Sequence, residues 1–366
     1  MIYTFVYAIL SVLCIINPTV KKAQKNWLMY GGALIILLFQ ALRWKTGTDW
    51  NPYLNEFLNV NSPHWIDEFE PGYQFLNSIV RHLTDKYTVF LLVECGLNLF
   101  FITFFLKKMP INNPCLGLLY FFVLAIFPIR FTLASNLILC SYIFILKRKI
   151  IPFCLLVISA YLIHRTAIAF LPMYFICQRN YSFRFLMIVY ISSIILGLLA
   201  EYTFGNLLQI ASMMYGFTDS SVQGKMDAYV TGEIPDRLKM TPIRYAISII
   251  NSTLFILIFY YFKRTKFNNN YIYSLLFTLY VFGISFNRIF LQTIPDMARM
   301  TSFFTGGFII MIIMIISSFK KSIQPIATIG VIGYLFLTYR SQIYGYYQDL
   351  FIPYYSIFEN PIRSMY

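Results

Sequence analysis

Residues 43–73 read RWKTGTDWNPYLNEFLNVNSPHWIDEFEPGY and form the first long polar stretch of an otherwise apolar chain. The stretch follows an apolar run that Arg43 closes, and it holds five of the fifteen acidic residues of the protein. Segments that connect apolar elements carry much of the chemistry of proteins. We therefore predict that this stretch, within a loop of about residues 43–86, contributes to the functional site.

The rest of the chain has the composition of a membrane protein. Hydrophobic residues make up 58% of the 366 residues and charged residues only 12%, whereas soluble domains carry about 25% charged residues. Apolar runs recur that are long enough to cross a bilayer as helices. They are continuous rather than alternating, which excludes a transmembrane barrel. We predict an all-α polytopic membrane protein whose residues 1–366 form a single integral membrane domain.

About twelve transmembrane or half-membrane helices are predicted from these runs. The expected segments are 2–18, 27–42, 87–106, 115–129, 131–146, 150–163, 165–177, 185–200, 243–262, 271–290, 300–319 and 323–338. Long extracytoplasmic loops are expected at about 43–86 and 201–242, and an extracytoplasmic tail at about 339–366.

The basic residues predict the orientation of these segments. Fifteen of the 29 lysines and arginines cluster in every second connection, and none of the fifteen acidic residues falls there. Since basic loops stay on the cytoplasmic side, we predict that these connections are cytoplasmic and that both termini are extracytoplasmic. Topology then accounts for the formal net charge of +14, and we expect no nucleic-acid partner.

Two apolar regions have an unusual length. Residues 116–146 contain Arg130 as their one charged residue, and residues 150–177 contain His164 and Arg165. Each region is about 30 residues long, which is too long for one ordinary span and short for two. Hairpins of short helices would keep every basic cluster on the cytoplasmic side. We therefore predict that Arg130 and His164 lie at hairpin tips recessed below the outer face.

Familiar catalytic motifs are absent from the sequence. It has no Walker A, GxGxxG, HExxH or GxSxG motif and no acidic pair at DxD spacing. We accordingly expect no nucleotide site, no cofactor and no metal site. The remaining candidates are arginines, acids and one histidine of the outer side.

Arg43, Arg130 and Arg299 each lie at the outer end of a predicted segment. Arginines at helix ends often extend to the lipid headgroups, and this is the alternative for each of them. Three arginines that border one compartment favour a site for an anionic lipid headgroup, because guanidinium holds phosphate oxygens bidentately and keeps its charge. Arg165 is a fourth candidate, and Glu94 within the third segment is a candidate partner for one arginine.

Candidate proton acceptors lie in the same compartment. Asp49 and Glu70 flank the polar stretch, next to the turn residues Gly47 and Pro71. A carboxylate there can act as a general base toward a sugar hydroxyl if burial raises its pKa; the alternative is two solvated loop acids. His164 is either a hydrogen-bonded packing residue or a functional group, and ionisable residues inside apolar segments favour the second.

These residues resemble a known family. The pattern Arg43, Gly47-Thr48-Asp49, Tyr53 and Glu70-Pro71-Gly72-Tyr73 resembles the EpsG family of Wzy-like polysaccharide polymerases. The similarity continues through Ile129-Arg130, Ala134, Ile163-His164, the region of Arg299 and the tyrosine- and proline-bearing tail. The family pattern has a glutamine after the arginine of the first hairpin tip, where this chain has Phe131.

The resemblance implies a bacterial inner-membrane enzyme that polymerises oligosaccharide repeat units linked to undecaprenyl pyrophosphate. One lipid-linked unit would be the donor and another the acceptor. The fold would be similar to the metal-independent membrane glycosyltransferases of the GT-C type, and the product would be a polysaccharide such as O-antigen of lipopolysaccharide or exopolysaccharide. A flippase and a chain-length regulator are the protein partners that this role suggests, within the lipid bilayer.

On this basis we expect an inverting glycosyl transfer at the outer leaflet. The donor pyrophosphate would be held, and its developing charge neutralised, by Arg43, Arg130, Arg165 and Arg299. The acceptor proton would pass to Asp49, Glu70 or His164, with Asp49 ranked first. Faces for stacking of sugar rings would come from Trp50, Tyr53 and Tyr73.

Three other classes of function fit parts of the pattern. An O-antigen-ligase-like or other lipid-linked-sugar glycosyltransferase uses the same chemistry on a different acceptor. A flippase or transporter of the same lipid predicts broken helices at mid-membrane and related halves, whereas the acids crowd the outer side and the sequence shows no internal repeat. A membrane O-acyltransferase would depend on His164 and would leave the stretch 49–73 without an obvious role.

The hairpin tips are testable by cysteine labelling. Cysteines placed at positions 130 and 164 are expected to react with a membrane-impermeant maleimide added from outside, because both positions lie at outward tips. Labelling from the cytoplasmic side would contradict this topology.

Overall fold

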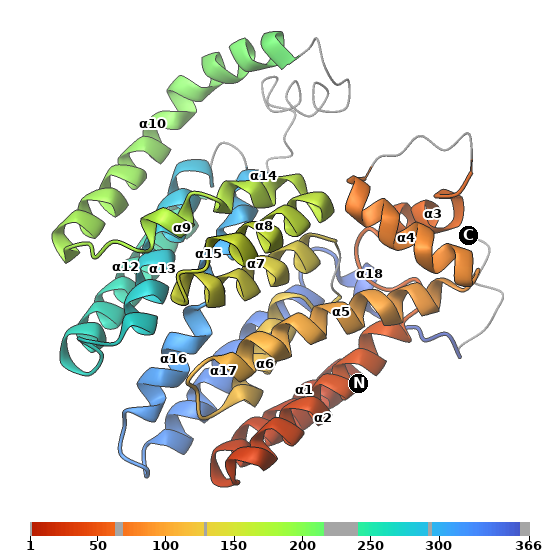
Figure 1. Ribbon diagram of the computed structural model, residues 1–366, viewed down its shortest axis with the longest axis horizontal. Coiled ribbons are helices and arrows are strands. Elements are labelled where there is room, and N and C mark those ends of the chain that lie inside the picture. Colours follow the sequence, from red (N-terminus) through yellow and green to blue (C-terminus); the bar gives the residue numbers. More distant parts are fainter. Residues whose placement is uncertain (1, 63–68, 128–129, 216–240, 292–294, 359–366) are drawn as a thin grey trace. The chain divides into compact units, whose positions relative to one another are not determined.

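The computed structural model describes residues 2–62, 69–127, 130–215, 241–291 and 295–358 (Figure 1). Regular structure in these ranges is helical, and an isolated bridge between Arg43 and Ser356 is the one β-type pairing within them. The helical prediction is therefore confirmed for the described residues. The chain divides into two compact units, unit 1 with residues 1–171 and 312–366 and unit 2 with residues 172–311. The single integral membrane domain stays a prediction.

Unit 1 is a bundle of helices. Its elements are α1 (Ile2–Ile16), η1 (Asn17–Thr19), α2 (Lys22–Ala41), α3 (Trp50–Asn59), α4 (Pro71–Leu83), α5 (Tyr87–Lys108), α6 (Pro114–Leu124), α7 (Arg130–Leu146), α8 (Ile150–Ile163), η2 (Arg165–Phe170), α17 (Gln324–Ile343) and α18 (Gln348–Phe351). Within the bundle α2 packs on α5, α5 on α7, and α7 on α8, while α6 contacts α1, α2 and α17.

Unit 2 contains longer helices and a broken segment. Its elements are α9 (Met173–Ile176), α10 (Phe183–Tyr215), α12 (Pro242–Thr265), α13 (Tyr271–Phe290), α14 (Pro295–Ala298), η4 (Arg299–Thr301) and α15 (Ser302–Thr305), and α16 (Phe308–Ser317) continues into unit 1. In this unit α13 packs against both α10 and α12.

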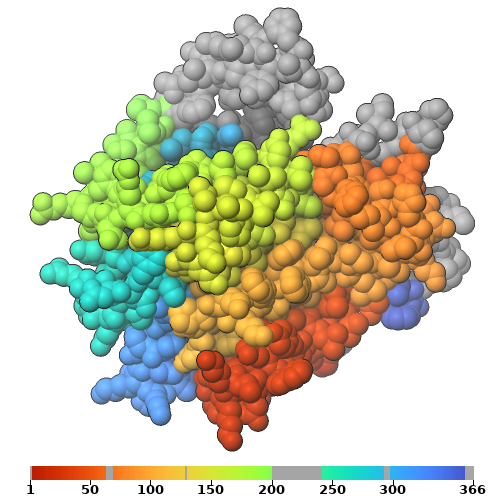
Figure 2. All heavy atoms as spheres, viewed as in Figure 1, coloured from red at the N-terminus to blue at the C-terminus, as the bar shows by residue number. Residues whose placement is uncertain are grey.

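Within the described residues, five helical segments are long and apolar enough to cross a membrane: Ile2–Thr19, Tyr87–Lys108, Pro242–Thr265, Tyr271–Phe290 and Arg299–Ser317. Shorter apolar helices accompany them. Large apolar side chains such as Phe5, Leu34 and Phe100 are more than half exposed. The first helices, red to orange, form part of the outer surface that Figure 2 shows. Exposed apolar side chains of this kind are typical of a membrane protein, because lipid covers the surface that carries them. The number of twelve spans stays a prediction.

The helix breaks predicted inside the two long apolar regions are present. The helix α6 ends at Leu124 and α7 begins at Arg130, while α8 ends at Ile163 and His164 is its C-cap residue. The side-chain amide of Gln40 from α2 donates hydrogen bonds to the carbonyls of residues 125 and 126, which satisfies carbonyls left open at the end of α6.

Several boundaries differ from the prediction. Residues 165–177 form a 3-10 helix and the short α9 rather than one segment, and residues 300–319 are divided among η4, α15 and α16. The helix α10 continues through residues 201–215, where a loop was predicted, because this stretch is mostly apolar and without proline. The remainder of that predicted loop, residues 216–240, lies outside the described residues.

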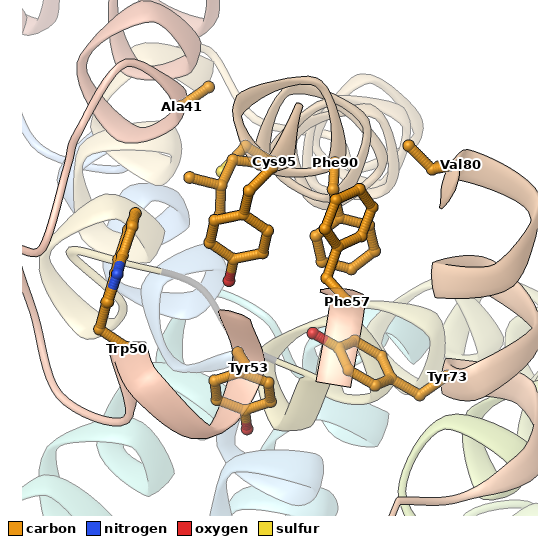
Figure 3. Close-up of a cluster of buried hydrophobic side chains, with 10 residues drawn as sticks. Ala41, Trp50, Tyr53, Phe57, Tyr73, Val80, Phe90 and Cys95 are labelled. Atoms are coloured by element: carbon orange, nitrogen blue, oxygen red, sulfur yellow. The ribbon is translucent and has the colours of Figure 1, made fainter. Parts of the chain in front are cut away.

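The polar stretch after α2 is not an irregular loop, because it contains α3 and α4. Both helices are amphipathic. Trp50, Tyr53 and Phe57 line the buried face of α3 at helical spacing, and Tyr73 and Val80 do so on α4. These side chains pack on the first turns of α5 in one aromatic cluster (Figure 3).

Gly72 allows α4 to approach α8. A Cβ atom on this residue would lie 2.7 Å from the carbonyl oxygen of Leu162. Because a backbone atom cannot rotate away, only glycine fits at this contact. The approach brings the first turn of α4, with Glu70 as its N-cap residue, beside the junction of α8 and η2.

The C-terminal tail runs along residues 42–47. The contacts are the bridge between Arg43 and Ser356 and the hydrogen bonds from Trp44 N to Tyr355 O (2.9 Å), from Ile357 N to Leu42 O (3.0 Å) and from Gly47 N to Leu350 O (2.7 Å). Gly47 has a φ of +103°, a conformation that glycine adopts without strain. The tail thereby fixes the backbone on which Arg43 stands.

The close contact of Gly72 with the backbone of Leu162 can be tested by adding a single methyl group at residue 72. Gly72→Ala is expected to destabilise the protein by about 1–3 kcal/mol, as overpacking does, and to lower the midpoint of thermal unfolding. Gly96→Ala in α5 is the matched control, since no atom lies within 4 Å of its Cβ position. Equal midpoints for the two variants would contradict the tight contact of α4 with α8.

Candidate functional site

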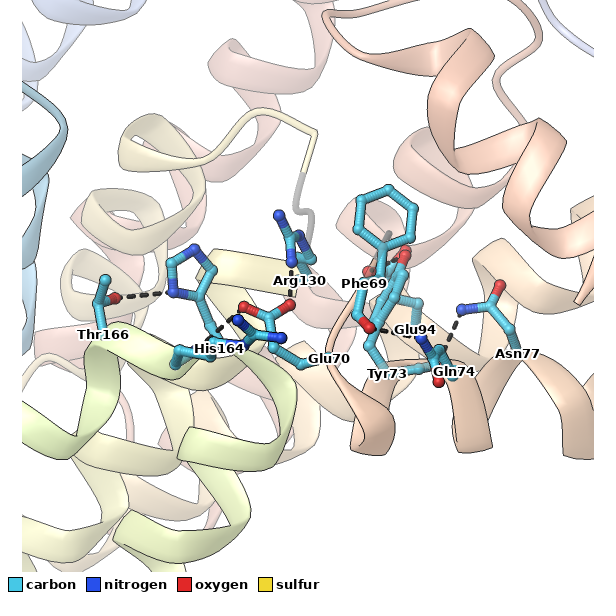
Figure 4. Close-up of polar contacts among 10 residues, drawn as sticks. Phe69, Glu70, Tyr73, Gln74, Asn77, Glu94, Arg130, His164 and Thr166 are labelled. Carbon is cyan, nitrogen blue, oxygen red and sulfur yellow. Dashed lines mark hydrogen bonds and ion pairs between the residues drawn. The ribbon is translucent and has the colours of Figure 1, made fainter. Parts of the chain in front are cut away.

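The carboxylate of Glu70 lies at the centre of a charged cluster in unit 1 (Figure 4). Glu70 is buried, and its Oε2 atom forms an ion pair with Nη1 of Arg130. Its Oε1 atom accepts a hydrogen bond from the backbone N–H of Arg165 (3.1 Å). Although Glu70 is the N-cap residue of α4, its side chain does not cap this helix. The carboxylate instead joins α4 to α7 and to the start of η2.

The position of Arg130 is further defined by aromatic rings. Its guanidinium carbon lies 4.5 Å from the centroid of the Phe69 ring, a cation–π contact. The ring of Phe69 stacks on Tyr53, with centroids 5.3 Å apart and planes inclined by 13°. The sequence places Arg130 at a helix start, and the structure adds a carboxylate and an aromatic face as its partners.

His164 lies beside this ion pair (Figure 4). It is the C-cap residue of α8, and the residue after it donates the backbone N–H to Glu70. Its Nδ1 atom lies 2.7 Å from the hydroxyl oxygen of Thr166, and its ring meets Phe131 edge-on at 5.1 Å. The imidazole is partly exposed. A titratable group is thus fixed next to the charges of Glu70 and Arg130.

A second acid, Glu94, lies deeper in the same unit. Its Oε1 atom accepts a hydrogen bond from the hydroxyl of Tyr73 (3.3 Å), and both side chains are buried. The charge of Arg43 acts on this carboxylate. The sequence singled out Glu94 as a candidate partner for an arginine; no ion pair joins it to Arg43 in the structure, and the pairing stays a prediction.

Arg43 is a buried cation with unused donors. Its side chain is 5% exposed, and Nε and Nη1 have no hydrogen-bond partner in the part of the chain that the structure describes. The guanidinium carbon lies 4.4 Å from the Phe127 ring centroid and 5.7 Å from that of Trp50. A buried guanidinium with unpaired N–H groups is a binding element for an anion.

Tyr53 reports on the charges around it. Burial raises the pKa of Tyr53 to about 12; Arg130 acts in the opposite direction, and Glu94 and Asp49 add smaller increases. The charges of Arg130, Glu94 and Asp49 therefore all act on one phenol. Asp49 is the N-cap residue of α3 with a φ of 57°, and its side chain is exposed and makes no capping hydrogen bond.

The predicted sugar-stacking residues are core residues in this structure. Trp50, Tyr53 and Tyr73 are 7%, 8% and 1% exposed. Trp50 packs edge-on against Trp44, and Tyr53 and Tyr73 pack against each other. Their ring faces are covered by protein, so stacking on a sugar would require these contacts to open. The sugar-binding role stays a prediction.

The structure brings together some of the predicted site residues and leaves others apart. Glu70 and Arg130 form an ion pair with His164 beside it (Figure 4), and Arg43 lies in the same unit against Trp50 and Phe127. Arg165 is exposed, and its backbone N–H donates a hydrogen bond to Glu70. Arg299 belongs to unit 2, in η4, and its side chain is exposed.

Sequence reasoning missed Phe69, Phe127 and Thr166. Each lies within three residues of a predicted site residue, and this proximity could have pointed to them. It was too weak a signal, because aromatic and hydroxyl residues are common throughout the chain. Within the described residues, no three histidine, cysteine or acidic side chains gather as metal ligands.

Comparison with known proteins identifies one family. A model of the EpsG family matches residues 26–356, which is most of the chain and includes every residue of the cluster described above. No curated protein and no solved structure matches the chain.

The ion pair is testable by a double-mutant cycle. Glu70→Gln and Arg130→Gln each leave a charge without its partner, and each is expected to lower stability toward the lower end of about 3–5 kcal/mol, since Arg130 is partly exposed. The double variant should lose less than the sum. Unfolding midpoints in detergent measure this.

The exposed ion pair of Arg81 and Asp85 supplies the control, because the Asp85 side chain is 87% exposed. Asp85→Asn should cost at most about 1 kcal/mol. Additive effects of Glu70→Gln and Arg130→Gln would contradict their coupling.

Proposed function

The chain belongs to the EpsG family, and from this premise we propose that it polymerises oligosaccharide repeat units linked to undecaprenyl pyrophosphate. The family match supports a polysaccharide polymerase, and the apolar helices support its place in a membrane. The proposed site is the cluster of Glu70, Arg130, His164 and Arg43 in unit 1. The observation that carries the proposal is this cluster of charge within the matched residues of a membrane protein.

Arg43 is the proposed anchor of the donor pyrophosphate. Its Nε and Nη1 atoms lack partners in the described chain, so a phosphate oxygen would satisfy donors that folding leaves unused. Arg130 already has Glu70 as a partner. It would therefore hold a fixed position beside the substrate and supply positive charge as the pyrophosphate leaves.

Glu70 is better suited to positioning than to proton transfer. One carboxylate oxygen is paired with Arg130 and the other accepts the N–H of Arg165, so both oxygens are engaged in holding neighbouring segments. His164 is the base that the geometry supports best, because it lies beside the ion pair, is partly exposed and is held at Nδ1 by Thr166. Imidazole takes up protons at neutral pH.

The proposed step is a single displacement. The acceptor hydroxyl oxygen attacks the anomeric carbon of the donor sugar from the face opposite the pyrophosphate. The bond between that carbon and the phosphate oxygen breaks, its electron pair leaves with the lipid pyrophosphate, and the hydroxyl proton passes to His164. The configuration at the anomeric carbon inverts. Positioning of two bound substrates supplies much of the rate.

Asp49 is the alternative base. It is exposed at the start of α3, and its charge reaches Tyr53 together with that of Arg130. Arg165 and Arg299 are retained as proposed contacts of the pyrophosphate. The proposed setting is the outer leaflet of the bacterial inner membrane, with both termini outside, where a flippase would deliver the repeat units and a chain-length regulator would act on the polymer.

The proposed roles are testable in a deletion strain. Complementation with Arg43→Gln, Arg130→Ala or His164→Ala is expected to shorten or abolish the glycan ladder, and loss of the base should reduce turnover about 10²- to 10⁴-fold. Asp49→Asn and Arg299→Ala test the remaining assignments, and Asp85→Asn is the exposed control. Blots for the protein verify equal expression.

The ladder also separates the classes of function. Single repeat units that remain on the lipid core indicate a lost polymerase, whereas the absence of all attached glycan indicates a ligase. Normal ladders from Arg43→Gln, Arg130→Ala and His164→Ala together would end the assignment of this site.

A further inference from the structure

Arg288 is a buried arginine inside an apolar helix of unit 2. It lies in the last turn of α13, a helix that is long and apolar enough to cross a membrane, and it is 2% exposed. Ionisable residues in such helices are costly and usually functional.

One nitrogen of Arg288 cross-links two helices. Its Nη2 atom donates to the carbonyl oxygen of Ser248 (2.8 Å), to the hydroxyl of the same residue (3.0 Å) and to the hydroxyl of Ser252 (2.8 Å), both on α12. Tyr190 of α10 places its hydroxyl 2.8 Å from that of Ser252. These hydrogen bonds fix the orientation of the guanidinium, and they engage its Nη2 nitrogen.

The other two nitrogens, Nε and Nη1, have no partner in the described chain. They carry three of the five N–H donors of a guanidinium. Two further buried groups without partners lie close by. The ring of Tyr245, whose hydroxyl is unpaired, is centred 5.8 Å from the guanidinium carbon, and the unpaired hydroxyl of Ser285 is one turn before Arg288 on α13.

We propose that Arg288, Tyr245 and Ser285 form an anion-binding site in unit 2 that takes the phosphate or pyrophosphate group of a membrane lipid. Every unpaired group of the three can donate a hydrogen bond. No aspartate or glutamate of unit 2 is among the residues whose side chains are described, so none of these described side chains is a counter-ion for Arg288. Phosphate oxygens would satisfy both the charge and the donors.

The lipid is inferred from the setting of the site. Isoleucine and leucine side chains cover the exposed faces of α10 and α12, including Ile191, Ile195, Ile247 and Leu254. A ligand that reaches Arg288 from such a surface needs an apolar chain beside its anionic group.

The identity of the lipid as a second lipid-linked repeat unit rests on the proposed function. A polymerase binds a donor and an acceptor that each carry a pyrophosphate. The chain holds a buried guanidinium with unused donors in each unit, Arg43 in unit 1 and Arg288 in unit 2. The anion site itself does not depend on this assignment.

Binding to the purified full chain in detergent tests the proposal. Native mass spectrometry is expected to show two undecaprenyl pyrophosphate molecules on the wild type and one on Arg288→Gln. Neutral undecaprenol should bind both proteins equally. Arg264→Gln is the control, because this arginine is exposed in the last turn of α12.

Tyr245→Phe is a second variant that separates a loss of lipid binding from a folding defect. Its hydroxyl has no partner among the described residues, so its removal should leave the unfolding midpoint without lipid unchanged. It should weaken the second binding event about tenfold, as the loss of one hydrogen bond to a charged group does. Inorganic pyrophosphate distinguishes the sources: competition by it indicates recognition of the headgroup alone, and lack of competition indicates that the lipid chain is required.

Equal stoichiometry and equal affinity for the wild type, Arg288→Gln and Tyr245→Phe would overturn the proposal. The glycan ladder is read separately. If lipid binding depends on Arg288 but deletion of the gene leaves polymer length normal, the anion site is retained and the proposed function is overturned. If the variants bind lipid as the wild type does, while deletion of the gene abolishes the glycan ladder, only the anion site in unit 2 is overturned.

Discussion

The buried carboxylate of Glu70 is the constraint on which the cluster in unit 1 depends. A carboxylate removed from water needs compensation for its lost hydration, and here Arg130 and the backbone of Arg165 provide it. These two donors stand on α7 and η2, while the carboxylate stands on α4. One charge therefore holds three segments in register and places His164 beside them.

The helices were predictable because lipid imposes long apolar runs on a chain. Residues 150–163 were expected as a helix and form α8 with the same bounds. The breaks at Arg130 and His164 were also predictable, since charged residues interrupt runs that are too long for one span and short for two. The position of the cluster along the chain followed from the same argument.

Partnerships between distant residues were not predictable from one sequence. Glu70 and Arg130 are 60 positions apart, and no local pattern joins them. The amphipathic spacing of Trp50, Tyr53 and Phe57 indicates a helix with a buried face, but the polar composition of 43–86 concealed it. Arg288 was overlooked because residues 271–290 were treated as one apolar run of spanning length, and the single arginine within the run was not considered separately.

The pairing of the tail with residues 42–47 sets an order of events during synthesis. Arg43 leaves the ribosome long before Tyr355 and Ser356, which hold its backbone, are made. The backbone around Arg43 can therefore take its final form only after these later residues have been made. A nascent chain that has not yet reached these residues would thus have its first helices formed while the backbone of residues 42–47 still lacks its partners from the tail.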